Sequence, residues 1–284
     1  MPVSKEGAQR ASRHRPFRSL RLIAIAALAS VMAIGGLAVH PESVAASGKK
    51  VVIVVGPAGS NTADYIYNAK KLASQARSYG ATVYEIYAPH ATWARVKSLS
   101  QGANVFIYLG HGNGYPSPYG AFNTYSKDGL GLDAYDGSWS HKYYGEYYIS
   151  HYLNFAPNSV VILNRLCYAS GDSEWGAANP TKSTAIKRVD NYGAGFLRTG
   201  ARAVFAEGIN SSSYILYGLF KTTRTIAQIF WSDPARKGSY DFTFSSSRTP
   251  GRTAIMDPMA TSRYYRSVIG DLGMTAASWR LAGA

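Results

Sequence analysis

Two residues suited to nucleophilic catalysis each follow a run of strand-forming residues. His111 comes directly after "VFIYLG" (105–110), and Cys167 comes directly after "SVVILNRL" (159–166). A thiolate is a strong nucleophile, and a nearby imidazole either favours the thiolate or accepts the thiol proton as the bond forms. Gly112 leaves a backbone N–H uncovered which, with the N–H of Cys167, could face a developing oxyanion. These residue types therefore indicate a Cys/His pair that acts on a carbonyl carbon.

The elements that must position this pair follow an alternating pattern. Apolar, β-branched runs typical of strands are separated by apolar stripes at helical spacing. The alternation predicts right-handed crossovers and an α/β fold: a three-layer sandwich with a mostly parallel central sheet of about five or six strands. The expected strands are residues 51–55, 81–89, 103–110, 159–166 and 201–208, with helices between them at 65–79, 91–101 and 183–200.

This fold class brings the pair together. The carboxyl ends of parallel strands lie along one edge of the sheet, where such folds hold their ligands. Neighbouring strands lie about 4.8 Å apart. If the strands that end at His111 and Cys167 are neighbours, the imidazole and the thiol can meet across a reacting carbonyl.

The segments outside the alternation are less regular. Residues 113–142 are rich in Gly, Pro, Ser, Asp and Tyr, which predicts a long ordered loop. A tyrosine-rich helix is expected over 143–153, and a buried-face helix over 215–230. In the tail, 245–258 resembles a loop, and 262–273 fits a last helix or an edge strand.

The two motifs resemble those of the caspase-like cysteine peptidases, the superfamily of caspases, legumains, gingipains and separase-like CHAT peptidases. In those families His-Gly follows the third strand, and the fourth strand ends in a cysteine followed by small residues and glycine, as in "VVILNRLCYASG" here. The resemblance implies a caspase-like α/β domain over residues 47–284. It also implies that His111 is the general acid and base, that Cys167 is the nucleophile and that Gly112 belongs to the oxyanion site. The mechanism it implies is acyl transfer through a thioester.

Each of these residues also has a purely structural interpretation. Cysteine is among the residues most often buried in cores, and His111 alone could cap a turn. The other histidines after the leader, His90, His141 and His151, lie near no recognisable acid or cysteine motif. Surface or packing roles are expected for these three.

Two acidic residues follow the cysteine closely. Asp172 and Glu174 could form an acidic pocket for an Arg or Lys side chain of a substrate, because a charged side chain that enters a cleft needs a counter-charge. A solvated loop is the alternative for both. Arg165, two residues before the cysteine, stands where members of the superfamily often have a small or acidic residue, so the resemblance carries no substrate preference.

No organic cofactor is expected, and calcium is the alternative to a site without a metal. Asp128, Asp133 and Asp136 in "KDGLGLDAYDG" supply the oxygen ligands that calcium prefers. Their spacing is not that of an EF-hand loop, and Asp beside Gly is ordinary turn chemistry. The turn "GPAGSNT" after the first strand lacks both common nucleotide-binding patterns, which argues against nucleotide binding.

The first 46 residues read as a secretory signal peptide. Six basic residues precede an apolar run from Leu22 to Val39, and the small residues at 43–46 suit signal peptidase. An uncleaved membrane anchor is the alternative. The later sequence has no second run long enough to span a bilayer. Its one cysteine excludes an internal disulfide.

Charge and location suggest the partners. Residues 47–284 contain 24 basic and 14 acidic residues, a net charge of about +10 that is scattered along the chain. Such a field suits an anionic cell-wall polymer, a membrane surface or an acidic substrate, and a solvated basic surface without a partner is the alternative. Nucleic acid is not expected, because no groove-reading motif is present and the leader predicts secretion.

The sequence therefore predicts a secreted cysteine endopeptidase that acts on peptide or protein substrates. The first alternative is a catalytically silent caspase-like fold that serves as an extracellular protein- or cell-wall-binding module. It would present the tyrosines of "GYPSPYGAFNTY" and "YYGEYYISHY" as a contact surface. The second is a cell-surface structural protein that holds anionic polymer through its positive charge.

Overall fold

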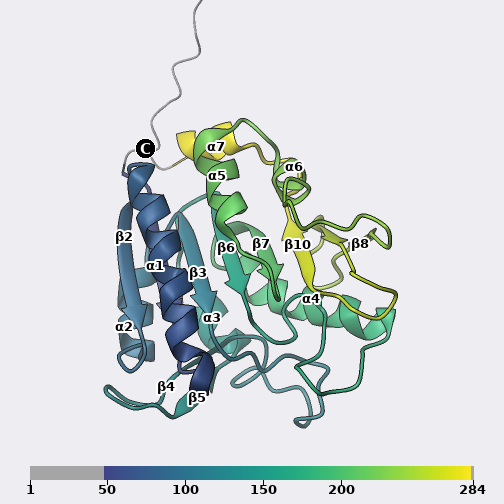
Figure 1. Ribbon diagram of the computed structural model, residues 1–284, viewed down its shortest axis with the longest axis horizontal. Coiled ribbons are helices and arrows are strands. Elements are labelled where there is room, and N and C mark those ends of the chain that lie inside the picture. Colours follow the sequence, from purple (N-terminus) through teal and green to yellow (C-terminus); the bar gives the residue numbers. More distant parts are fainter. Residues whose placement is uncertain (1–47, 283–284) are drawn as a thin grey trace, which may run out of the picture. The chain divides into compact units, whose positions relative to one another are not determined.

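A mostly parallel sheet forms the centre of the fold in the computed structural model (Figure 1). The structure describes residues 48–282, so the expected signal peptide (1–46) lies outside the described residues. All five strands expected from the sequence are present and parallel. They are β1 (Lys50–Val55), β2 (Thr82–Tyr87), β3 (Val105–Leu109), β6 (Ser159–Asn164) and β7 (Ala201–Glu207).

The sheet is larger than expected, because three antiparallel strands extend it. These are β8 (Phe242–Ser245), β9 (Thr253–Met256) and β10 (Arg266–Gly270), and the full order is β2-β1-β3-β6-β7-β10-β9-β8. The prediction of five or six strands is therefore wrong, and so is a loop over 245–258. The Pro-Gly turn between β8 and β9 dominates that stretch and hides the four-residue β9, while β8 ends at its first residue.

The last of these strands is not at the edge of the sheet. β10 lies between β7 and β9, with Val268 opposite Phe205 on one side and opposite Ile255 on the other. Each residue of β10 is buried, as an internal strand requires. The expectation of a last helix or an edge strand over 262–273 is corrected accordingly.

Helices cover both faces of the sheet. One face carries α1 (Thr62–Ser78), α5 (Ser213–Lys221), α6 (Ile226–Phe230) and α7 (Ala276–Leu281), whose apolar residues share one core. The other face carries α2 (Trp93–Ser100), α3 (Glu146–Tyr152) and α4 (Lys182–Leu197). The α/β architecture with helices on both faces is thus as the alternation predicts.

The helix expected over 215–230 is divided into α5 and α6. Thr222 is extended after α5, and Thr225 starts α6 with a capping box in which its side chain accepts a hydrogen bond from Gln228 N. A threonine that can cap a new helix competes with continuation of the old one. The apolar pattern alone does not show this interruption.

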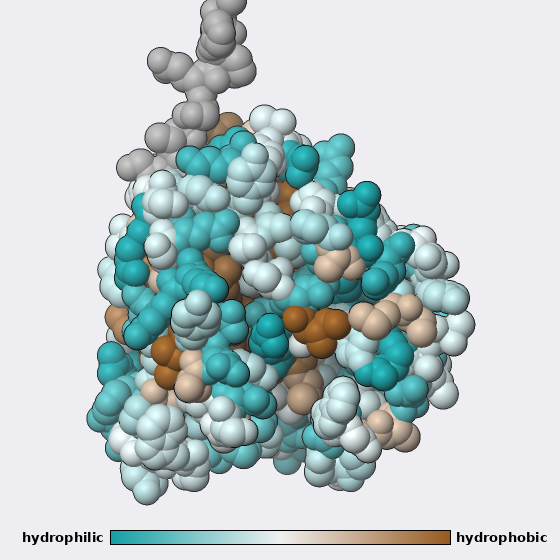
Figure 2. Space-filling view, in the orientation of Figure 1, coloured by the Kyte–Doolittle hydropathy of each residue, from teal (hydrophilic) through white to brown (hydrophobic). Residues whose placement is uncertain are grey.

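The residues of each central strand divide between the two cores. In β1, Val52 and Val54 pack with one helical layer, while Val51, Ile53 and Val55 pack with the other. Continuous apolar runs are therefore needed, because neither face of these strands meets solvent. The surface seen in Figure 2 is largely hydrophilic, and its apolar residues form small separate spots.

The segment after β3 contains more order than a loop. Within 113–142 the chain forms β4 (Leu130–Asp133), which pairs with β5 (His141–Tyr144) in a separate antiparallel hairpin. The buried Lys127 fixes the rest of the segment, because its Nζ donates to Asn113 Oδ1, Ser117 Oγ and Tyr119 O at 2.8–2.9 Å. The segment that follows β3 is therefore held in place by these hydrogen bonds.

The arrowheads of β3, β6 and β7 point to the same end of the sheet, near the β4–β5 hairpin (Figure 1). None of the helices within residues 48–282 has both the length and the apolar character that a bilayer span requires.

Candidate active site

The strands that precede the two candidate catalytic residues are neighbours. β3 pairs with β6 in parallel, and Leu109 lies opposite Asn164 at the carboxyl end of the pair. His111 follows two residues after Leu109, and Cys167 three residues after Asn164. Both side chains are half-buried. The structure thus brings the two residues to one edge of the sheet.

The turns that carry the two residues touch at Gly112. A Cβ atom at Gly112 would lie 2.3 Å from Cys167 O and 2.7 Å from Tyr192 Oη, so only glycine fits this position. Within residues 48–282, the backbone N–H groups of Gly112 and Cys167 donate to no backbone acceptor. The Cys167 N–H contacts the thiol of its own residue, so the Gly112 N–H is the donor that can serve a developing oxyanion in this state.

Cys167 lines a cavity of about 430 Å³, which we name the catalytic cavity. Its walls come from the turn after β6, the 172–179 segment, and residues that follow β7 and precede β10. His111 is not among the lining residues.

His111 has a second histidine as its neighbour. The ring centroids of His111 and His141 lie 4.8 Å apart, with an angle of 39° between the ring planes. Burial first, and then His141, lower the pKa of His111, while Glu174 acts in the opposite direction. The imidazole is consequently neutral at pH 7, which is the form that can accept a proton.

His141 is the residue of this site that the sequence did not identify. A surface or packing role was expected, and His141 is indeed exposed; the β4–β5 hairpin packs its ring against that of His111. Gly131 of the same hairpin donates its N–H to His111 O at 3.2 Å. No local motif marks this approach, since 30 residues of irregular sequence separate the two histidines.

The thiol is in its neutral form. Burial, followed by the charge of Glu174, raises the pKa of Cys167 to about 11. An imidazole beside a thiol can either form a thiolate–imidazolium pair in the resting enzyme or accept the thiol proton during attack. The raised pKa disfavours the resting ion pair. The arrangement supports the other role, in which His111 accepts the thiol proton as the bond to carbon forms.

The turn that carries Cys167 has an unusual backbone. Arg165 has φ of 58° and Tyr168 has φ of 71°, a left-handed conformation that side chains other than glycine rarely adopt. The surrounding structure holds both residues: Arg165 N donates to Glu207 O at 2.7 Å, and the Arg188 guanidinium lies 4.7 Å from the centre of the Tyr168 ring. Strained backbone of this kind gathers at functional sites.

The two acidic residues predicted for substrate binding both line the catalytic cavity, but their environments differ. Asp172 is buried, accepts from Ser173 N at 2.9 Å, and lies 3.5 Å from Arg263 Nε. Glu174 is half-buried and accepts a hydrogen bond from the Tyr119 hydroxyl. Glu174 is therefore the carboxylate without a cationic partner within the described residues.

The catalytic cavity is not purely acidic. Arg165 and Arg263 line it as well, which balances the two carboxylates in formal charge. Trp175, next to Glu174, is 95% exposed at the same wall. Of these three residues only Arg165 stands out in the sequence, as a departure from the superfamily pattern. Arg263 and Trp175 do not, because their part in the cavity arises only when the ends of β6, β7 and β10 meet.

The three carboxylates considered for calcium have separate partners. Asp128 is buried and accepts from Tyr115 N at 2.9 Å, and Asp133 accepts from Ala91 N at 2.6 Å. Asp136 lies 2.9 Å from His90 Nδ1. In the part of the chain that the structure describes, no three His, Cys, Asp or Glu side chains form a group that could hold a metal ion.

Comparisons with protein-family models, with curated proteins and with solved structures found no match to this chain. The site combines a thiol in a cavity, an imidazole at the adjacent strand end, and Gly112 where the two turns touch.

Proposed function

We propose that this protein is a secreted cysteine endopeptidase with a caspase-like fold, in which Cys167 is the nucleophile and His111 the general acid and base. The observation that supports the proposal best is the parallel pairing of β3 with β6. It makes the two residues emerge from adjacent strand ends, and Gly112 brings their turns into contact. Adjacent strands in a sheet are about 4.8 Å apart, a separation that a thiol and an imidazole can bridge around one carbonyl.

The reaction begins from neutral groups. His111 accepts the proton of the Cys167 thiol while the sulfur attacks the carbonyl carbon of a peptide bond. The backbone N–H groups of Gly112 and Cys167 stabilise the oxyanion. His111 then gives its proton to the departing amine, which leaves a thioester on Cys167. In the second half, His111 takes a proton from water while the water oxygen attacks the thioester carbon. The C–S bond then breaks, His111 returns the proton to the sulfur, and the carboxylic acid product leaves.

Glu174 is the residue that we assign to substrate selection. A basic side chain entering the catalytic cavity needs a counter-charge, and the Asp172 carboxylate is already near Arg263. The Tyr119 hydroxyl that donates to Glu174 is neutral, so it does not compensate the negative charge of the carboxylate. We therefore expect cleavage next to Arg or Lys, with Asp172 keeping the Arg263 side of the wall in place.

Peptide cleavage by matched variants tests the proposal. The purified protein should cleave a panel of peptides, and both Cys167→Ala and His111→Ala should reduce the rate by at least a factor of about 100. His151→Ala is the matched control, since this exposed histidine lies on α3, and it should keep the wild-type rate. Circular dichroism should show that all three variants fold. A folded wild-type protein that cleaves no peptide would refute the proposal.

A second candidate function follows from the raised pKa of the thiol, which is also typical of an inert buried cysteine. In that case the fold is a catalytically silent binding module. A cluster of aromatic rings supports it: Tyr147 and Tyr148 pack edge to face at 5.7 Å, beside the exposed Tyr125 and Tyr152. Such rings form low-entropy contact surfaces. A Cys167→Ala variant that keeps every effect of the wild type would favour this function.

A further inference from the structure

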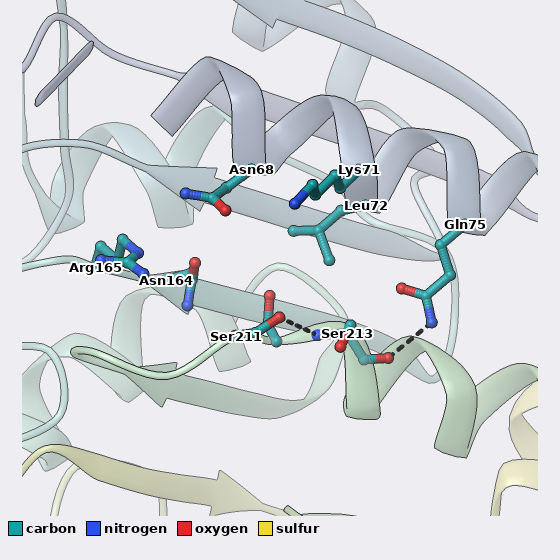
Figure 3. A pocket seen from close by; sticks show the side chains of 9 residues that line it. Asn68, Lys71, Leu72, Gln75, Asn164, Arg165, Ser211 and Ser213 are labelled. Atoms are coloured by element: carbon teal, nitrogen blue, oxygen red, sulfur yellow. Dashed lines mark hydrogen bonds between the residues drawn. The ribbon is translucent and has the colours of Figure 1, made fainter. Parts of the chain in front are cut away.

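A second cavity lies between α1 and α5, and its walls are cationic. It has a volume of about 170 Å³ and is lined by polar residues that include Asn68, Lys71 and Gln75 from α1, and Arg165 from the turn after β6. None of its lining residues is acidic. In Figure 3, Asn68 and Lys71 extend from α1 above Asn164 and Ser211. We name this space the α1–α5 cavity.

The positive charges of this cavity are not neutralised within residues 48–282. Neither Lys71 nor Arg165 forms an ion pair there. Lys71 Nζ lies 4.3 Å from the centre of the Tyr67 ring, and this contact leaves its N–H groups available to another acceptor. Two cations that face one small polar space repel each other unless an anion lies between them.

The N-terminus of α5 closes one side of the cavity. Ser211, Ser212 and Ser213 all line it, and the first turn of the nine-residue α5 carries a partial positive charge. Ser213 N already donates to Ser211 Oγ and Ile215 N to Ser212 O, so Tyr214 N is the N–H of this turn that is left for an anion. Gln75 Nε2 donates to Ser213 O at 2.9 Å, which joins α1 to the start of α5 (Figure 3). This hydrogen bond fixes the wall of the cavity where α1 meets the start of α5.

Ser212 supplies an independent indication of a ligand. It is 0% exposed, its Oγ has no hydrogen-bond partner within the described residues, and it lines the cavity. Ser212 is also the N-cap of α5, yet its side chain makes no capping hydrogen bond. A buried hydroxyl without a partner is costly, so an oxyanion that draws this wall of the cavity toward itself would gain a hydrogen bond from Ser212.

We propose that the α1–α5 cavity binds a tetrahedral oxyanion, a phosphate or sulfate group, through Lys71, Arg165, Ser212 and the N-terminus of α5. The volume is suitable, because it equals that of about five or six water molecules in the liquid. This proposal does not depend on peptidase activity, since binding can be measured without turnover.

The bound group also influences the thiol, because Arg165 lines both cavities and precedes Cys167 by two residues. An oxyanion holds the Arg165 guanidinium toward the α1–α5 cavity and adds negative charge near the thiolate. Both effects disfavour ionisation of the thiol. Occupancy of the α1–α5 cavity should therefore lower the reactivity of Cys167.

Calorimetry with inorganic phosphate tests the site. We expect saturable binding that weakens with added sodium chloride, and at least a roughly tenfold loss of affinity in Lys71→Met. Lys70→Met is the matched control, since this exposed lysine on the same helix does not line the cavity. Absence of saturable binding in the wild type, or an equal loss in Lys70→Met, would overturn the proposal. Glycerol 3-phosphate, compared with inorganic phosphate, distinguishes a group on a larger molecule from the free ion.

Two further measurements separate a ligand site from a structural role. Ser212→Ala should weaken phosphate binding, while its melting temperature in phosphate-free buffer stays unchanged or rises, because a hydroxyl without a partner is removed. A lowered melting temperature with unchanged phosphate affinity would assign Ser212 to packing and contradict the site. Saturating phosphate should slow alkylation of Cys167 severalfold relative to sodium chloride of equal ionic strength. If saturating phosphate leaves the rate of Cys167 alkylation unchanged, Arg165 does not contact the bound phosphate, which contradicts its assignment to the site.

Discussion

We expect the charge of Glu174 to lower the reactivity of the thiol, and Glu174→Gln tests this directly. With the pKa of Cys167 raised to about 11, about one thiol in 1,000 is ionised at pH 8. Glu174 is the second cause of that rise after burial. Glutamine keeps an acceptor for the Tyr119 hydroxyl but removes the charge. Each unit by which the pKa falls raises the thiolate fraction about tenfold and the alkylation rate about three- to fourfold, because a less basic thiolate is a weaker nucleophile.

The assay is alkylation by iodoacetamide between pH 7 and pH 11, followed by mass spectrometry. The Glu174→Gln profile should lie at lower pH than the wild-type profile. Cleavage next to Arg or Lys should fall relative to cleavage next to neutral residues. Asp241→Asn serves as the control, because this exposed carboxyl does not line the catalytic cavity. A Glu174→Gln profile identical to that of the wild type would refute the electrostatic reasoning. A wild-type thiol that titrates below pH 8.5 would refute the effect of burial.

Three further substitutions follow from the same geometry. Gly112→Ala places a Cβ 2.3 Å from Cys167 O, so urea unfolding should show a loss of about 1–3 kcal/mol and peptide cleavage should fall sharply. His141→Phe removes a cause that lowers the pKa of His111, so NMR titration should show that pKa higher than in the wild type. Burial raises the pKa of Asp128 to about 8 in the folded protein. A carboxyl whose pKa is raised on folding stabilises the fold fully below its pKa in the unfolded chain, and this contribution is lost as the pH rises to its pKa in the folded protein. The free energy of unfolding of Asp128→Asn should therefore increase relative to that of the wild type as the pH rises from about 4 to about 8. Urea unfolding at pH 5 and pH 9 measures this, and the same difference between the two proteins at both pH values would contradict it.

The parallel part of the sheet could be predicted because burial on both faces demands a distinctive sequence. Runs such as "VVIVV" and "SVVILN" are apolar without interruption, and the helical stripes between them give the strand order. The shared edge of His111 and Cys167 follows from the parallel arrangement, whereas the direct pairing of their strands does not follow from the order along the chain. Both residues end strands, and parallel strands share one edge.

Other parts of the site depend on contacts that the sequence does not encode locally. The approach of His141 to His111 requires a hairpin made largely of Gly, Asp and Tyr, whose pattern is that of a loop. The raised pKa of the thiol depends on the distance to Glu174, which lies on a separate segment of the cavity wall. The strands β8 and β9 are too short for a period of two to be recognised beside a Pro-Gly turn.

The antiparallel addition to the sheet has a consequence for solubility. An unpaired strand offers a row of N–H and C=O groups to other molecules and invites edge-to-edge aggregation. Here β10 and β9 shield the seven-residue β7, and the outermost strand on that side is the four-residue β8, in which partly and fully exposed residues alternate. The opposite border is β2, whose Glu85 carries an ion pair with Arg77. Because the edge strand β8 is short and the edge strand β2 carries a charged residue, strands of other molecules have little edge to pair with. Both features disfavour edge-to-edge aggregation.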